Sequence, residues 1–141
     1  MKRIAVLFSV VLLVITLCGC NGDWEINLPG GFSIDRINSH HIALTKEGQF
    51  VINNFFVTSL QIHEPYVCIK GIETEGSSAT EDEIRARDTV CYLLNTETDE
   101  LAGPYENEEE FRAYCKEVGV VMDELWMPAG YKVSEQFKEV S

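Results

Sequence analysis

Apolar residues occur along most of the chain in short runs separated by turn-forming residues, which is typical of β-strands. Over residues 32–37, Phe32 and Ile34 alternate with the polar Ser33 and Asp35, so one face of an extended segment is apolar. Further runs that contain β-branched or aromatic residues cover residues 41–45, 57–62, 66–72 and 89–95, and residues 101–104 are expected to add a short return strand. The pattern predicts an antiparallel meander of about six strands.

Turn-forming residues separate these runs. Residues 46–48 end in a glycine, which adopts a positive φ without strain, and they predict a hairpin loop. An Asn pair lies in the middle of residues 51–57, between two β-forming stretches, and because Asn tolerates the left-handed region we expect a second hairpin there. Pro65 lacks a backbone donor and predicts a turn between the runs on either side of it.

Residues 108–118 have the apolar spacing of a helix, whereas residues 73–83 have no apolar periodicity. Residues 108–118 follow Asn107, a suitable N-cap, with Glu110 three residues later and Gly119 at the end. The apolar residues at helical spacing in this segment are Phe111, Tyr114, Cys115 and Val118. Residues 73–83 are rich in Glu, Ser and Thr without apolar periodicity, so we expect a solvated loop.

The beginning of the chain has the pattern of an export signal. Lys2 and Arg3 precede a mainly apolar run of fourteen residues, 4–17. A membrane span needs about 18 to 20 apolar residues, so this run is too short to act as one. Residues 1–19 are therefore predicted to be a signal peptide, and the rest of the protein is expected to be extracytoplasmic.

The end of this signal resembles the lipobox of bacterial lipoproteins. The residues are Leu17-Cys18-Gly19-Cys20, in which a thiol directly follows a small residue. The resemblance implies that Cys20 receives a diacylglyceryl group, becomes the first residue of the mature protein and anchors it to the bacterial cell membrane. Cys18 fits less well as the acceptor because it follows the bulky Leu17. The alternatives are a cleaved signal that leaves Cys20 an ordinary thiol, and an uncleaved anchor.

Removal of residues 1–19 leaves 122 residues, the usual size of one domain. We therefore expect a short lipidated tether over residues 20–23 and a single domain over residues 24–141. The expected fold class is α+β, with a small antiparallel β-sheet of about six strands packed by one C-terminal amphipathic helix.

The charge of the mature chain limits its partners. Nine Lys and Arg remain against 23 Asp and Glu, which gives a formal charge of −14. Binding to nucleic acid depends on neutralising phosphates, so this balance argues against it. It also argues against adhesion to anionic lipids. Attachment to the membrane would then depend on the lipid on Cys20, and a protein remains as a candidate partner.

Two longer segments carry a family resemblance. Residues 24–39 contain Leu28-Pro29-Gly30-Gly31 before an aromatic residue, and residues 89–111 contain Gly103-Pro104-Tyr105 before the predicted helix. Both segments resemble an uncharacterised family of short bacterial lipoproteins. The resemblance implies the same small fold and the same anchor, and it implies no activity or binding residue.

Few residues form a pattern with chemical meaning. The neighbouring His40 and His41 would point to opposite faces of a strand, so they cannot bind one metal together, and His63 lies beside a turn. The acidic clusters at residues 81–83 and 108–110 lack the alternating ligands and glycine of a calcium loop. We find no motif for catalysis, nucleotide binding or a cofactor. We therefore expect neither a metal nor a cofactor.

Three thiols remain once Cys18 is removed and Cys20 is acylated. Cys115 lies on the apolar face of the predicted helix and reads as a core residue. Cys68 and Cys91 lie within two predicted strands that could be neighbours, and an extracytoplasmic setting permits a disulfide between them. An odd number of thiols leaves at least one unpaired.

Three functions are compatible with these features. The first is a non-enzymatic lipoprotein that binds or shields a component of the cell envelope. The second is an immunity or inhibitor lipoprotein whose acidic surface binds a basic toxin or enzyme, since complementary charge speeds and orients an encounter. The third is an envelope enzyme with a site assembled from scattered acidic residues and histidines.

Overall fold

The protein folds into two antiparallel sheets and two helices, as described by a computed structural model over residues 24–129. The predicted signal peptide, Cys20 and the predicted tether, and residues 130–141 lie outside the described residues. The first sheet consists, in spatial order, of β1 (Trp24–Asn27), β2 (Phe32–Asn38), β3 (His41–Lys46) and β4 (Gln49–Phe50). The second consists of β8 (Leu101–Tyr105), β7 (Thr89–Asn95), β6 (Tyr66–Glu73), β5 (Phe55–His63) and β9 (Met127–Pro128).

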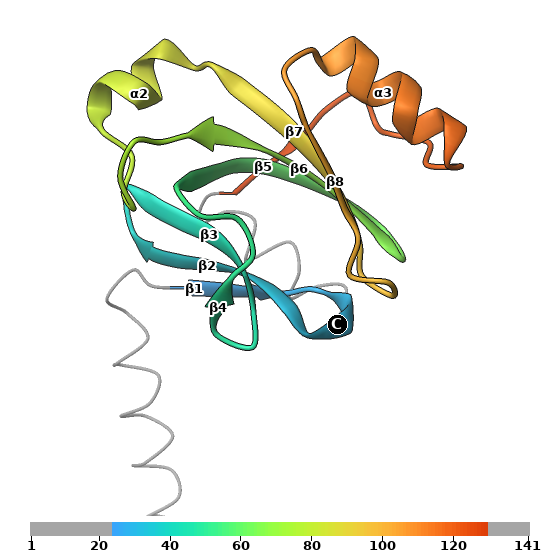
Figure 1. Ribbon diagram of the computed structural model, residues 1–141, viewed down its shortest axis with the longest axis horizontal. Coiled ribbons are helices and arrows are strands. Elements are labelled where there is room, and N and C mark those ends of the chain that lie inside the picture. Colours follow the sequence, from blue (N-terminus) through green and yellow to red (C-terminus); the bar gives the residue numbers. More distant parts are fainter. Residues whose placement is uncertain (1–23, 130–141) are drawn as a thin grey trace, which may run out of the picture.

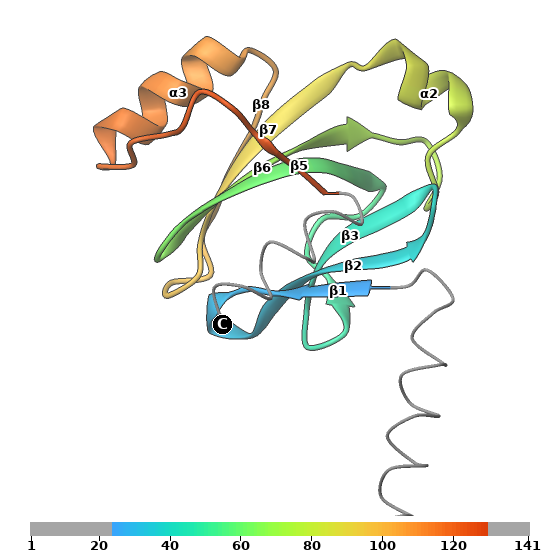
Figure 2. The same ribbon diagram turned by 180° about the vertical axis from the view of Figure 1, so that it is seen from behind.

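The elements form three layers. The second sheet lies over the first, and the helix α3 (Glu108–Glu117) lies on the outer face of the second sheet (Figures 1 and 2). The helix α2 (Glu81–Ala86) lies at one end of the two sheets (Figure 1). A short 3-10 turn, η2 (Pro29–Gly31), joins β1 to β2. The α+β fold class is as predicted, whereas the expected single meander of about six strands is in fact two sheets with nine strands in the described range.

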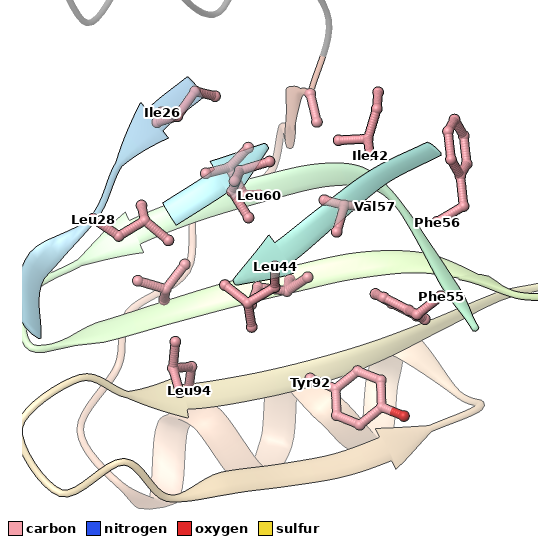
Figure 3. Close-up of a cluster of buried hydrophobic side chains, with 14 of the residues drawn as sticks. Ile26, Leu28, Ile42, Leu44, Phe55, Phe56, Val57, Leu60, Tyr92 and Leu94 are labelled. Carbon is pink, nitrogen blue, oxygen red and sulfur yellow. The ribbon is translucent and has the colours of Figure 1, made fainter. Parts of the chain in front are cut away.

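The inner core lies between the two sheets. Apolar side chains from β1 to β3 face apolar side chains from β5 to β7, and Figure 3 shows how they interlock. The most deeply buried members include Ile34, Leu44, Val57, Leu60, Val67, Ile69 and Leu94. Burial of one such side chain contributes about 1.5–3 kcal/mol relative to exposure, so this core supplies most of the driving force for folding.

The strand β7 is buried on both faces. Val90, Tyr92 and Leu94 belong to the inner core, while Cys91 and Leu93 belong to a second cluster beneath α3. Because successive side chains of a strand point to opposite faces, an unbroken apolar run is what such a strand requires. One strand therefore contributes to both cores.

The helix α3 begins at Glu108, as predicted. The Asn107 side chain accepts hydrogen bonds from the backbone N–H groups of Glu109 and Glu110, at 2.8 and 3.2 Å. At the other end Gly119 has a φ of 90°, and the N–H of Val120 donates to the Cys115 carbonyl at 2.8 Å. This hydrogen bond and the positive φ of Gly119 are those of a Schellman motif, which satisfies carbonyls of the last helical turn.

The second predicted hairpin, at residues 51–57, is wrong. Asn54 does adopt a positive φ of 53°, but this segment carries the chain from one sheet to the other. The strand before it pairs with β3, whereas β5 after it pairs with β6. Val51 and Ile52 pack against the inner core instead of continuing a ladder. The hairpin at residues 46–48 is confirmed, with positive φ at both Glu47 and Gly48.

The predicted loop at residues 73–83 ends in a helix that the prediction missed. Thr80 caps α2: its hydroxyl accepts from the Glu83 N–H at 3.2 Å, and the Glu83 carboxylate accepts from the Thr80 N–H at 3.0 Å. The pKa of Glu83 is lowered mainly by that backbone hydrogen bond. Ala79 is buried and Ile84 packs against the inner core. A six-residue helix is too short to show apolar periodicity, so only the Thr-x-x-Glu capping box could have revealed it.

The outer layer can be tested through α3. Phe111 has no exposed surface, so Phe111→Ala should lower the free energy of unfolding by roughly 3 to 5 kcal/mol. Glu109 is exposed on the opposite face of the helix, and Glu109→Ala should change it by less than about 0.5 kcal/mol. Denaturant titration of both variants gives the two values. Similar losses would contradict the packing of this helix face.

Candidate functional site

The helix α3 covers only part of the sheet on which it lies. Its ten residues extend for about 15 Å, at about 1.5 Å per residue. The eight residues of β6 extend for about 27 Å, at about 3.4 Å per residue. The helix packs on Cys68, Cys91 and Leu93, near the middle of β6 and β7, and leaves open the part beside the start of β6 and the end of β7.

A groove lies where the sheet is uncovered. It has a volume of about 340 Å³ and is bounded by the C-terminal half of α3, the ends of β6 and β7, and the start of β8. The residues that line it are Tyr66, Leu93, Asn95, Glu100, Leu101, Ala102, Tyr114 and Val118, and we call it the α3 groove. Leu93 is buried, while Tyr66 and Tyr114 are half-buried. The volume lies at the lower end of the range of about 300–1,000 Å³ that is typical of ligand sites.

The α3 groove combines an apolar lining with unused polar groups. Within the described part of the chain, the hydroxyls of Tyr66 and Tyr114, the amide nitrogen of Asn95 and the carboxylate of Glu100 have no hydrogen-bond partner. A hydroxyl both donates and accepts, an amide nitrogen donates, and a carboxylate accepts. A small molecule in the groove would therefore meet apolar contact and hydrogen-bonding capacity together.

The loops beside the groove are held in place by several bonds. The Asn95 Oδ1 accepts from the N–H groups of Glu97 and Thr98, at 3.0 and 3.3 Å. The hydroxyl and the N–H of Thr96 both donate to the Pro65 carbonyl, at 2.6 and 2.9 Å. The turn between β7 and β8 is thus tied to the turn between β5 and β6, which gives the groove fixed walls.

The groove lies at the end of the domain opposite the start of β1. The start of β1 pairs with the end of β2, so it lies at the same end of the domain as the β2–β3 turn. The segment before α2 contacts this turn, since the Ala79 N–H donates to the His40 carbonyl at 2.8 Å. The opposite end, which we call the distal end, contains η2 and the turns after β3, β5 and β7 (Figure 1). Lys46 and Asp99 join two of these turns at 2.6 Å.

Close backbone contact also joins the two sheets at the distal end. Gly30 has a φ of 73°, and a Cβ atom at this position would lie 2.3 Å from the Thr96 carbonyl oxygen. Only glycine avoids both the strain and the clash. A second hollow of about 480 Å³ lies beside this contact, next to Pro65 and Glu97.

The distal end is acidic. Exposed carboxylates project from each of its turns: Glu47, Glu64, Glu97, Asp99 and Glu100. Asp99 is paired with Lys46, and no other basic residue lies in these turns. The distal end would consequently favour a cationic or neutral partner over an anionic one.

A group of polar contacts around Glu108 has a structural role. Glu108 accepts hydrogen bonds from Lys70, from the Trp126 indole at 3.0 Å and from Arg112 at 3.3 Å. The hydrogen bond from Lys70 is the main reason why the pKa of Glu108 is lowered. Lys70 also lies 4.5 Å from the centre of the Trp126 ring. These contacts hold the segment after α3 against the outer face of the sheet.

Gln61 holds the same segment from the other side. Its amide nitrogen donates to the carbonyls of Asp123 and Leu125 at 3.0 and 3.3 Å, and its Oε1 accepts from the Asp123 N–H at 3.0 Å. Gln61 is almost fully buried, and these bonds explain why a polar side chain is stable there. Sequence reasoning identified neither Gln61 nor Trp126, because their partners are distant in sequence.

The three thiols lie in the cluster between α3 and the second sheet, where Cys68, Cys91 and Cys115 are buried and free. Cys68 pairs with Leu93 and Cys91 with Lys70, so the two cysteines are diagonal neighbours. Diagonal positions are about 7–8 Å apart, whereas a disulfide needs a Cα separation of about 4.4–6.8 Å. The register therefore disfavours the disulfide expected between Cys68 and Cys91.

These thiols are poor nucleophiles. Burial raises the pKa of Cys91 to about 11, and it is also the main reason why the pKa values of Cys68 and Cys115 are raised. The thiolate is the reactive form of cysteine, and it is scarce at neutral pH when the pKa is this high. The environment of the three thiols is that of core residues.

The histidines and acidic clusters are dispersed. His40 lies 3.9 Å from Glu81, His41 contacts the Phe50 ring, and His63 hydrogen-bonds Gln61 at 2.9 Å. The cluster at residues 81–83 forms the first turn of α2, and the cluster at residues 108–110 forms the first turn of α3. Between residues 24 and 129 no group of three or more His, Cys, Asp or Glu side chains could hold a metal ion.

Comparisons of the chain with protein-family models, with curated proteins and with solved structures found no match. The predicted lipidation residue, Cys20, lies outside the described residues. None of the helices that the structure describes is both long enough and apolar enough to cross a membrane.

Proposed function

We propose that the mature protein is a lipoprotein of the bacterial cell envelope that is anchored through Cys20 and acts by binding. The export signal and the lipobox-like residues 17–20 support the anchor, and the resemblance to short bacterial lipoproteins agrees with it. The α3 groove is the observation that supports binding, because it offers an apolar lining with unused hydrogen-bonding groups.

The chemistry of the described residues favours binding over catalysis. The two carboxylates with a lowered pKa, Glu83 and Glu108, are held by structural hydrogen bonds and do not line the α3 groove. The thiols are buried and protonated, and the histidines are apart from one another. A general acid or base would need a suitable pKa within reach of a bound substrate.

The position of the groove suits an anchored protein. Three residues separate Cys20 from Trp24, and a chain of three or four extended residues reaches about 10 to 14 Å. The start of β1 would therefore be held close to the bilayer. The distal end, with the α3 groove beside it, would then face away from the membrane.

The anchor can be tested directly in cells. The wild-type protein should incorporate a fatty-acid probe and partition into detergent, and Cys20→Ala should abolish both, because no other residue would receive the lipid. Cys18→Ala is the matched control and should behave as wild type. Labelling that persists in Cys20→Ala but is lost in Cys18→Ala would show that the acceptor was misassigned. No labelling of the wild-type protein would refute the anchor.

The acidic distal end favours a second candidate, an immunity or inhibitor lipoprotein that binds a basic toxin or enzyme. Exposed carboxylates on three adjacent turns would attract such a partner over long distances. The cluster at residues 81–83 is less suited to this role, because Glu83 caps α2 and this helix lies at the opposite end of the domain.

Charge reversal tests this second candidate. With a basic protein captured from cells, changing Glu47, Glu64 and Glu97 together to Lys should slow association, and rising salt should weaken binding as the Debye length falls below about 8 Å. The control changes Glu75, Asp88 and Glu106 to Lys, because these exposed acids lie at the end opposite the distal turns. Equal effects of the two triple variants, or none from salt, would exclude electrostatic steering by the distal end.

A further inference from the structure

The composition of the α3 groove is unusual for a surface that binds only apolar groups. Tyr66 and Tyr114 form its walls, yet each keeps a hydroxyl that has no partner within residues 24–129. Asn95 and Glu100 add one unused donor and one unused acceptor. An apolar peptide side chain would leave these four groups without partners, and loss of hydrogen bonds to water costs free energy.

We propose that the α3 groove binds one ring of a neutral or amino-bearing sugar, as part of an envelope polysaccharide. This inference rests on the proposed binding function and adds the class of ligand. A sugar ring carries C–H groups on its flat face and hydroxyls around its edge. The C–H groups suit the negative face of a tyrosine ring, and the hydroxyls can both donate and accept.

The orientation of Tyr114 supports this assignment. Its ring stacks on Tyr105, with centroids 5.5 Å apart and an angle of 25° between the planes. This contact uses one face of the Tyr114 ring and holds it in place. Since the side chain also lines the groove, its position is set before a ligand arrives, which reduces the entropy lost on binding.

Volume and charge limit which sugar can bind. A volume of about 340 Å³ accommodates a single ring with its substituents, so further rings of a polysaccharide would extend into solvent. Glu100 lies in the groove, and Glu97 is exposed in the same turn. An anionic uronic acid or phosphate would be repelled by these carboxylates, whereas an amino group would be attracted to them.

Saturation-transfer NMR on the full-length protein in detergent tests the proposal. The probes are a tetramer of N-acetylglucosamine, the corresponding tetramer of glucosamine and a tetramer of galacturonic acid. Transfer is expected to the first two, strongest at the C–H protons of one ring face, and absent for the anionic tetramer. No transfer to any of the three, or equal transfer to all three, would overturn the assignment.

Three variants of groove residues give the residue-level test. Tyr114→Ala should weaken binding of the glucosamine tetramer by at least about tenfold, through loss of both the ring contact and the hydroxyl. Tyr114→Phe keeps the stacking on Tyr105 and should weaken binding of the glucosamine tetramer about fivefold, the usual contribution of one neutral hydrogen bond. Glu100→Gln should weaken binding of the glucosamine tetramer more than binding of the acetylated one.

Phe50→Ala is the control, because Phe50 is an exposed aromatic residue on the first sheet. It should leave the affinity unchanged. Affinities that do not differ between the Phe50 and Tyr114 variants would place the sugar elsewhere and overturn the proposal. If no sugar binds but a protein from intact cells can be crosslinked at position 114, the sugar assignment is wrong and the binding function remains.

Discussion

The burial of β7 on both faces is the constraint on which the rest of the structure depends. Residues 90–94 alternate between the inner core and the cluster beneath α3, so every side chain of this segment must be apolar. A polar residue on one face would remove packing for the first sheet, and on the other face it would remove packing for α3. The two layers are therefore stabilised through one strand.

The groove follows from the lengths of the elements in this arrangement. A helix of ten residues cannot cover strands of seven and eight residues, so the outer face of the sheet is left open at the end that holds the α3 groove. That end is also where the β7–β8 turn is tied to Pro65 by Thr96. A groove between a helix and a sheet whose turns are fixed in this way can hold a ligand without a large conformational change.

Local sequence patterns allowed much of this fold to be predicted, but the long-range pairing of the strands could not be predicted from them. The runs that became β2, β3, β5, β6, β7 and β8 were visible as apolar stretches, and α3 was visible from its cap and its apolar face. The division into two sheets was not visible, because the segment after β4 has the same Asn pair that a hairpin would have. The residues of the α3 groove come from four separate elements, and in the sequence Tyr66, Asn95 and Glu100 look like ordinary residues at strand ends.

The central claim is that this protein acts by binding through the α3 groove, and site-specific photo-crosslinking in intact cells tests it most directly. A photoreactive phenylalanine derivative is placed at position 114 in the groove and, in a separate protein, at position 50 on the first sheet, where Phe50 is exposed. Because the derivative reacts with C–H bonds of sugars and proteins alike, it assumes no ligand. The account predicts a discrete adduct from position 114 and none from position 50. Adducts from position 50 alone, or equal adducts from both, would contradict it.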